Sequence, residues 1–194
     1  MTILVHPAST QLPAAEWNPS PVGNTCARSS ATTLGQMAAF YADVDAVAGM
    51  DPESILYRVQ WWEPVAPGIE GGLFCGGTIL EPGRVGEEYF MTKGHFHAVR
   101  NRGEYYATAA GEGMLLLMDE QRRTRVEVMA PGSLHYIPGA TAHRVVNTGD
   151  VPLRFWACWP SDAGHDYGTI ATEGFSARVL LRNGVPTLVP KDEQ

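Results

Sequence analysis

Short segments separated by turns of Gly and Pro are the feature that most constrains how this chain can fold. Such turns recur from residue 67 to residue 150, at Pro67-Gly68, Gly71-Gly72, Pro82-Gly83, Gly111-Glu112-Gly113, Pro131-Gly132, Pro138-Gly139 and Gly149-Asp150. Many short strands joined by frequent turns are typical of β-sandwiches and small barrels. The 21 Gly and 14 Pro among 194 residues agree with this pattern. We therefore predict an all-β fold.

The segments between the turns are predicted to be strands because they are rich in aromatic, β-branched and other apolar residues. They cover residues 55–62, 105–109, 114–118, 125–129 and 154–159. Before them, residues 1 to about 30 are rich in Pro, Ser, Thr and Asn and are predicted to form an arm or coil. Near-helical spacing of apolar residues predicts a short helix over 33–47. We expect an N-terminal arm and helix over 1–50 and a β domain over 51–194. We read Gly111-Glu112-Gly113 as a hairpin turn, because the third Gly of a dinucleotide loop is absent.

Composition excludes several classes of partner. The net charge is −7 and the isoelectric point is about 5.3, whereas nucleic-acid binders are usually basic. The longest strongly apolar run, 114–118, is far shorter than the roughly 20 residues of a membrane helix. No secretory signal is visible at the N-terminus. Three widely spaced cysteines, Cys26, Cys75 and Cys158, indicate free thiols. We expect a cytoplasmic protein that binds neither nucleic acid nor membrane.

Four residues have the chemistry of a metal site. His95 and His97 point to the same face if they lie on a strand, because side chains alternate along it. Glu104 follows after a polar turn, and a hairpin there would bring it back beside the two histidines. His143 is expected at the edge of another strand. Three imidazoles and one carboxylate suit a divalent transition metal with open positions.

The residues around His143 have the pattern Gly132-x5-Pro138-x-Ala140-x2-His143-x3-Asn147. This resembles the second motif of the cupin family, Gly-x5-Pro-x-Gly-x2-His-x3-Asn, with Ala140 where the family usually has Gly. The first cupin motif is matched by His95, His97, Glu104 and Gly111, although the gap before Glu104 is long and the leading Gly is missing. The resemblance implies a cupin jelly-roll barrel.

Two further segments resemble the cupin-type glucose-6-phosphate isomerases: residues 81–97, EPGRVGEEYFMTKGHFH, and residues 162–170, DAGHDYGTI. The similarity runs from about residue 55 to 189. It implies a homodimeric, metal-dependent enzyme of glycolysis and gluconeogenesis that interconverts glucose 6-phosphate and fructose 6-phosphate. The implied ion is Fe²⁺, with Mn²⁺, Zn²⁺ or Ni²⁺ as alternatives. Its implied ligands are His95, His97, Glu104 and His143.

The resemblance also implies roles for other residues. Thr78, Thr92 and Gly94 fall where the family holds the substrate phosphate, and Trp159 stands where we associate a phosphate-contacting Tyr. Tyr106 and His165 fall where the family lines the sugar pocket, so we expect them, with Glu104, to be the catalytic set. Strict strand alternation instead places Lys93, and not Thr92, on the face of His95. A bulge at Gly94 would reconcile the two expectations.

Alternatives remain at this stage. Lys93, Arg100 and Arg102 form a cationic cluster that either attracts a phosphorylated sugar or lies as a solvated rim. A cupin dioxygenase or decarboxylase would use the same four ligands but would not require Thr78, Thr92 and Gly94. A non-enzymatic sugar-binding cupin often lacks a complete ligand set. A carboxylate at 104 is suited to move a carbon-bound proton, and a direct hydride shift is the other route.

Overall fold

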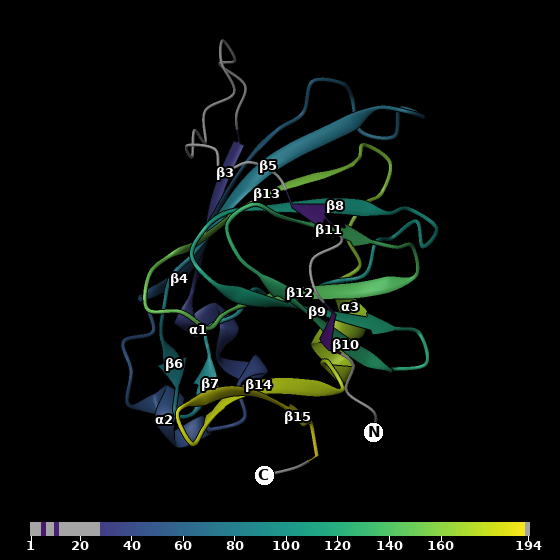
Figure 1. The fold of residues 1–194 in the computed structure, drawn as a ribbon. Coiled ribbons are helices and arrows are strands. Elements are labelled where there is room, and N and C mark those ends of the chain that lie inside the picture. Colours follow the sequence, from purple (N-terminus) through teal and green to yellow (C-terminus); the bar gives the residue numbers. More distant parts are fainter. Residues whose placement is uncertain (1–4, 7–9, 12–27, 193–194) are drawn as a thin grey trace.

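The computed structural model describes residues 5–6, 10–11 and 28–192, and it arranges the strands in three sheets (Figure 1). The largest sheet has seven strands in the order β2-β11-β8-β13-β5-β4-β3. Their bounds are β2 Thr10–Gln11, β11 Ser133–Ile137, β8 Glu104–Ala110, β13 Leu153–Pro160, β5 Leu73–Leu80, β4 Ile55–Trp62 and β3 Arg28–Thr33. All the pairs in this sheet are antiparallel.

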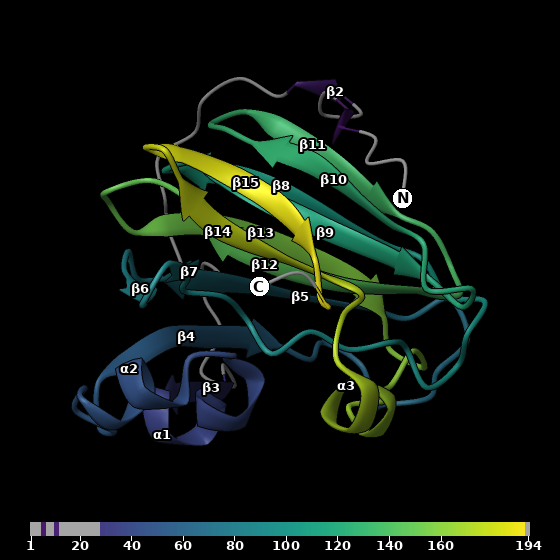
Figure 2. The same cartoon turned by 90° about the horizontal axis from the view of Figure 1, so that it is seen from below.

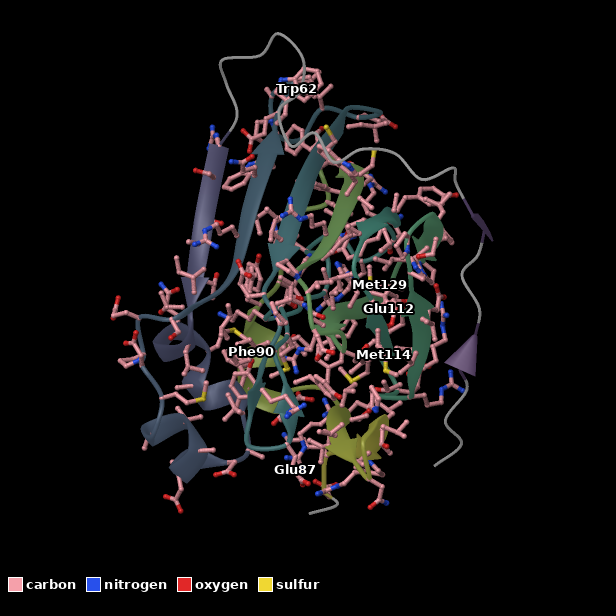
Figure 3. All side chains as sticks on the ribbon, turned by 60° about the vertical axis from the view of Figure 1, so that its left-hand side comes forward. Trp62, Glu87, Phe90, Glu112, Met114 and Met129 are labelled. Carbon is pink, nitrogen blue, oxygen red and sulfur yellow. The ribbon has the colours of Figure 1, made fainter. Side chains whose placement is uncertain are left out.

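The second sheet has four strands in the order β1-β10-β9-β12, with bounds β1 Val5–His6, β10 Thr124–Met129, β9 Gly113–Asp119 and β12 Thr141–Asn147. The chain passes from β8 to β9, from β10 to β11 and from β12 to β13, and each step changes sheet. Buried side chains from both sheets fill the space between them, including Met129 (Figure 3). The all-β prediction is confirmed, and the described strands form facing sheets without closing into one continuous barrel.

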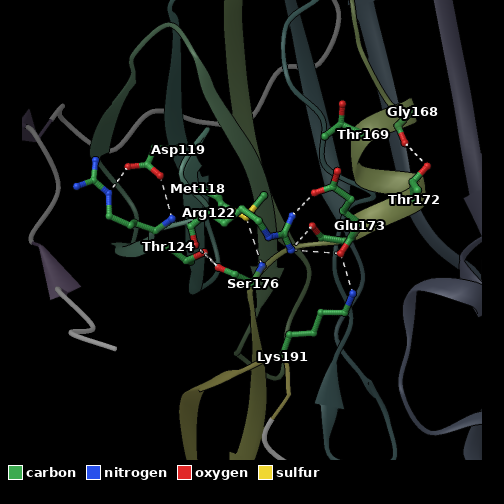
Figure 4. Close-up of polar contacts among 12 residues, drawn as sticks. Met118, Asp119, Arg122, Thr124, Gly168, Thr169, Thr172, Glu173, Ser176 and Lys191 are labelled. Atoms are coloured by element: carbon green, nitrogen blue, oxygen red, sulfur yellow. Dashed lines mark hydrogen bonds and ion pairs between the residues drawn. The ribbon is translucent and has the colours of Figure 1, made fainter.

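The third sheet follows the order β15-β14-β7-β6, with bounds β15 Val185–Pro190, β14 Ala177–Arg182, β7 Glu88–Tyr89 and β6 Arg84–Val85. A short helix, α3 (Gly168–Glu173), precedes it. Polar contacts fasten this region to β9 and β10 (Figure 4). Arg122 binds the Glu173 carboxylate at 2.9 Å, and the hydroxyls of Ser176 and Thr124 lie 2.7 Å apart. Lys191 donates to the Glu173 carbonyl oxygen at 2.7 Å.

The prediction of one helix over 33–47 is wrong, because the structure has three short helical turns there: α1 (Leu34–Met37), η1 (Ala38–Phe40) and α2 (Val44–Ala48). Tyr41 has extended dihedral angles, which interrupt the helix after Phe40. Asp43 begins α2 by accepting a hydrogen bond from the Ala46 amide at 2.8 Å. Leu34, Met37 and Tyr41 are buried, so the predicted apolar spacing does face the core. Figures 1 and 2 show these turns beside β3 and β4.

The predicted strand over 55–62 coincides with β4, and the other predicted strands agree with β8, β9, β10 and β13 to within one residue. The hairpin assigned to Gly111-Glu112-Gly113 is wrong. Gly111 has a φ of 79°, as a turn requires, but the turn joins β8 to β9, which lie in different sheets.

Most of the predicted arm, with Cys26, lies outside the described residues. Cys75 and Cys158 are free thiols. In the part of the chain that the structure describes, no helix is long and apolar enough to cross a membrane.

Candidate metal centre and sugar-binding cavity

The four predicted ligands come from three segments, two of which are strands of different sheets. His95 and His97 lie between β7 and β8, and Glu104 is the first residue of β8 in the seven-stranded sheet. His143 lies on β12, in the four-stranded sheet. The predicted hairpin between His97 and Glu104 is wrong, because the histidine segment pairs with β12 and not with β8. His95 and His143 form an antiparallel bridge, with amide-to-carbonyl distances of 3.3 and 3.1 Å.

Backbone carbonyls orient two of the rings. Nδ1 of His97 lies 2.8 Å from the carbonyl oxygen of Arg102, and Nδ1 of His143 lies 3.3 Å from that of Thr141. An Nδ1–H that donates to a carbonyl leaves Nε2 unprotonated and available to a cation, which is the usual support of a metal-binding histidine. Both rings are therefore fixed with Nε2 toward Glu104.

One ligand atom from each of the four residues lies within 4.8 Å of all the others. Oε2 of Glu104 is 3.1 Å from Nε2 of His97 and 3.0 Å from Nε2 of His143. The second contact lacks hydrogen-bonding geometry, and Nε2 of His95 is likewise buried without a hydrogen-bond partner. Buried polar atoms without partners are costly and rare. These nitrogens around one carboxylate fit a divalent ion, and imidazole and carboxylate together suit Fe²⁺, Mn²⁺, Zn²⁺ or Ni²⁺.

The electrostatics of the cluster keep His95 neutral and Glu104 ionised. Burial and the neighbouring His143 ring hold the pKa of His95 well below its ordinary value, so the ring is neutral at pH 7. Burial raises the pKa of Glu104, but the neighbouring His143 and His97 rings, the second through a hydrogen bond, outweigh it, and the net pKa is lowered. For His97, burial lowers the pKa and the Glu104 hydrogen bond outweighs it, giving a raised pKa. The carboxylate is therefore ionised.

A cavity of about 600 Å³ opens onto this cluster. It is lined by the other residues that the sequence singled out: Thr78, Thr92, Gly94, Tyr106, Trp159 and His165. The Trp159 ring packs edge-on against Phe74, with ring centroids 6.1 Å apart. The His165 ring lies 4.5 Å from the His95 ring and stacks on Tyr167 at 5.6 Å. Burial raises the pKa of Tyr106 well above its ordinary value and lowers that of His165, so both are neutral at pH 7.

The segment 92–95 does not follow strict strand alternation, because Gly94 has a φ of 74°. A side chain there would also meet the Phe175 ring at 2.7 Å and the His143 carbonyl oxygen at 2.9 Å. This left-handed residue lets Thr92, Lys93 and His95 all line the cavity. The Thr92 hydroxyl accepts a hydrogen bond from the Val145 amide at 3.0 Å and keeps its own proton to donate.

Lys93, Arg100 and Arg102 were expected to form one cationic cluster beside the ligands, but the structure separates Lys93 from the two arginines. Arg102 binds the Asp162 carboxylate through two nitrogens, the nearer at 2.7 Å, and Arg100 pairs with Asp166. These contacts hold the segment that carries His165. Lys93 lines the cavity instead.

Several residues that line the cavity were missed from the sequence. Tyr57 and Trp61 occupy alternate positions of β4, so period-two spacing from the predicted strand was a usable signal. Ser30 and Thr32 come from β3, which is polar except for Ala31 and pairs with β4 at the edge of the large sheet. Tyr167 lies in the segment 162–170 that carries the family resemblance, but no role was assigned to it.

Ala140, which departs from the cupin pattern, has a φ of 56°. Residues with a side chain rarely adopt this conformation, which explains why Gly is usual at this position of the motif. Asn147, at the end of the same motif, donates to the carbonyl oxygens of Leu80 and Val151, both at 2.9 Å. Its role is to join β12 to neighbouring segments.

Comparison with known proteins identifies relatives along most of the chain. The family model "Glucose-6-phosphate isomerase (GPI)" matches residues 31–193. A glucose-6-phosphate isomerase of Thermococcus litoralis is 42% identical over 160 residues, covering 81% of this chain and 83% of that protein. One from Pyrococcus furiosus is 43% identical over 162 residues, covering 81% and 84%. One from Pyrococcus horikoshii is 52% identical over 115 residues, and that match spans 59% of this chain and 61% of the Pyrococcus horikoshii protein.

A solved oxalate decarboxylase from Bacillus subtilis is 22% identical, with a TM-score of 0.44 over 56% of this chain and 26% of that one. This likeness is too distant to carry an inference. The family model matches most of the chain, and two relatives match about four-fifths of it at more than 40% identity. The chain belongs to the glucose-6-phosphate isomerase family.

Proposed function

We propose that this protein interconverts glucose 6-phosphate and fructose 6-phosphate, a step of glycolysis and gluconeogenesis, with a divalent ion held by His95, His97, Glu104 and His143. The observation that carries the proposal is the set of buried, unpartnered ring nitrogens around one carboxylate, at a cavity that also presents hydroxyl groups. Membership of the isomerase family supports the same reaction. We propose Fe²⁺ as the native ion, and Mn²⁺, Zn²⁺ and Ni²⁺ as ions that the same donors accept.

The ion, when bound, supplies polarisation of the sugar carbonyl. In our proposal, the Glu104 carboxylate takes the proton from C2 of the aldose and returns it to C1, while O1 gains a proton and O2 loses one. The product is the ketose, and no atom is gained or lost. The lowered pKa of Glu104 keeps it ionised and therefore basic at neutral pH. The neutral Tyr106 and His165 are suited to hydrogen-bond sugar hydroxyls.

We place the phosphate of the sugar at Thr78, Thr92, the Gly94 amide and the indole of Trp159. Neutral O–H and N–H donors around an anion give strong, charge-assisted hydrogen bonds. The Thr92 hydroxyl still has a proton to donate, and Gly94 allows close backbone approach. A Trp in place of a Tyr keeps one donor but changes its reach and shape.

The test of the function is a coupled assay with fructose 6-phosphate, before and after chelation and metal addition. We expect chelation to abolish isomerisation and Fe²⁺ or Mn²⁺ to restore it. Full activity in a sample shown to be metal-free would exclude the proposal. A metal-loaded protein that consumes oxygen or releases CO₂ from a carboxylic acid, without isomerising the sugar, would instead favour the cupin dioxygenase or decarboxylase.

Glu104→Gln tests whether Glu104 carries the proton, because the variant keeps the shape of the side chain but removes its basicity. If Glu104 carries the proton, kcat stays about 10²–10⁴-fold low at full metal occupancy, as is typical when a general base is lost. Wild-type product formed in D₂O would then contain deuterium at C1 or C2. Near-normal kcat in the metal-saturated variant, with no solvent label in wild-type product, would establish a hydride shift.

We also propose a cytoplasmic homodimer and a domain boundary near residue 50. The dimer is supported by the exposed edge strand β3, since exposed edges invite pairing and two-fold dimers are the commonest assembly. Light scattering that shows only a 21.0 kDa species would contradict it. Residues 28–33 join the large sheet, so limited proteolysis is needed to show whether 51–194 folds alone.

A further inference from the structure

Lys93 is the one Lys or Arg among the described residues that line the cavity. The nearby arginines are engaged elsewhere: Arg100 and Arg102 bind Asp166 and Asp162. Arg144 is buried, does not line the cavity, and donates to the Lys93 carbonyl oxygen at 2.7 Å. Lys93 is therefore the single permanently cationic side chain among the described lining residues, on a backbone that Arg144 holds in place.

Two aromatic rings hold the Lys93 ammonium. Its Nζ lies 5.3 Å from the centroid of the Phe40 ring and 5.1 Å from that of the Tyr167 ring. A cation over a ring face is attracted to it, yet the ring takes none of the conventional hydrogen bonds that an ammonium can donate. Among the described residues, no carboxylate oxygen lies within 4.0 Å of this nitrogen. The ammonium is thus positioned without being neutralised.

The carboxylates of the cavity already have partners of their own. Glu63 pairs with Arg28 at 3.1 Å and accepts from the Trp61 indole at 2.9 Å. Glu104 faces His97 and His143. A phosphate entering this half-enclosed space brings up to two negative charges, and leaving them without a cation is costly where the dielectric is low. Thr78 and Thr92 offer hydroxyl protons but no charge.

We propose that Lys93, held between Phe40 and Tyr167, is the residue that recognises the charge of the substrate phosphate and makes the site specific for phosphorylated over neutral sugars. The inference rests on the proposed function for the nature of the sugar. It assigns a cation to a phosphate site otherwise made of neutral donors. Phe40 belongs to η1, so this proposal also brings the N-terminal segment into substrate recognition.

The test is calorimetric binding of sorbitol 6-phosphate, an open-chain sugar phosphate that has no carbonyl to isomerise, to the metal-loaded protein. Lys93→Met removes the charge and keeps an apolar chain between the rings, and Lys93→Arg keeps the charge. Lys191→Met is the matched control, because it makes the same change in net charge at a residue bound to the Glu173 carbonyl (Figure 4). Metal content is measured in each variant.

We expect Lys93→Met to weaken sorbitol 6-phosphate binding by about tenfold or more, which corresponds to the loss of one hydrogen bond to a charged group. Lys191→Met should stay within twofold of wild type, and Lys93→Arg should bind more tightly than Lys93→Met. Binding within twofold of wild type in Lys93→Met would overturn the proposal, as would equal losses in the Met and Arg variants. If Lys93→Met loses affinity but the wild type isomerises no sugar phosphate, this inference stands and the proposed function fails.

Discussion

The buried carboxylate of Glu127 gives the sharpest test of how the interior is stabilised. Its Oε2 lies 2.7 Å from Nδ1 of His135, and its Oε1 is bound by Arg125. Nε2 of His135 lies 2.8 Å from the Ser133 hydroxyl, which in turn donates to Thr108 at 2.9 Å. Glu127, His135 and Ser133 are all buried. We call these five residues the interior polar chain.

Glu127→Gln keeps the shape of the side chain and removes its charge. The bond to His135 is buried, and a hydrogen bond to a charged group contributes about 1.5–3 kcal/mol. The Arg125 side chain is 33% exposed, so its pair is discounted to about 0–1 kcal/mol. We expect a loss of about 1.5–4 kcal/mol in the free energy of unfolding. Glu173→Gln is the matched control, because its pair with Arg122 is exposed and should cost less than about 1 kcal/mol.

The effect of Glu127→Gln should depend on pH. Burial raises the pKa of Glu127, but the hydrogen bonds from His135 and Arg125 outweigh it, and the pKa is lowered from 4.5. A carboxylate with a lowered pKa stabilises the fold above the unfolded pKa and loses that contribution as pH falls through the folded pKa. Urea unfolding should show the full difference between wild type and variant at pH 7 and a smaller one below pH about 4.5. A difference under about 0.5 kcal/mol at pH 7, or one that grows on acidification, would refute this account.

Three further predictions concern the backbone and the phosphate site. Ala140→Gly should raise the free energy of unfolding by roughly 0.5–1 kcal/mol, because removing the strain of a side chain at a φ of 56° outweighs the added entropy of the unfolded chain. An unchanged or lower urea midpoint contradicts this. Gly94→Ala should destabilise the fold by more than about 2 kcal/mol and reduce metal binding measured by calorimetry, since a Cβ meets the His143 carbonyl oxygen at 2.9 Å; wild-type values for both would show that the segment relaxes. Thr92→Val should raise KM for fructose 6-phosphate roughly 10–150-fold while Thr92→Ser stays near wild type; KM within twofold for the Val variant would place the phosphate elsewhere.

The sequence was sufficient where local pattern and structure agree. The strand over 55–62 was found because β-branched and aromatic residues dominate it, and the four donors were found because their spacing is specific. Ser30 and Thr32 were missed because β3 is polar except for Ala31, and a polar strand is recognised only by the neighbour that pairs with it. The turn at Gly111 was identified, but the sheets that it joins depend on long-range packing.

The place of Lys93 shows a different limit. Alternation predicts the face of a side chain only while the backbone stays in the β region, and Gly94 leaves it. That one residue lets successive side chains line the same cavity, so the position of the phosphate donors cannot be obtained by counting along the strand. The pairing of Arg100 and Arg102 with Asp166 and Asp162 was also beyond reach, because some 60 residues separate the partners.

The division of the ligands between two sheets gives the interior polar chain a part in the site. Glu104 begins β8 of the large sheet, while His143 lies on β12 of the smaller one, and their ligand atoms are 3.0 Å apart. The interior polar chain crosses the same interior, from Glu127 on β10 to His135 on β11 and through Ser133 to Thr108 on β8. Because interiors are close-packed, a change in sheet spacing would alter the separation of these donors. Donors drawn from a single hairpin would be fixed relative to one sheet only, whereas these four take their geometry from the packing that also forms the cavity.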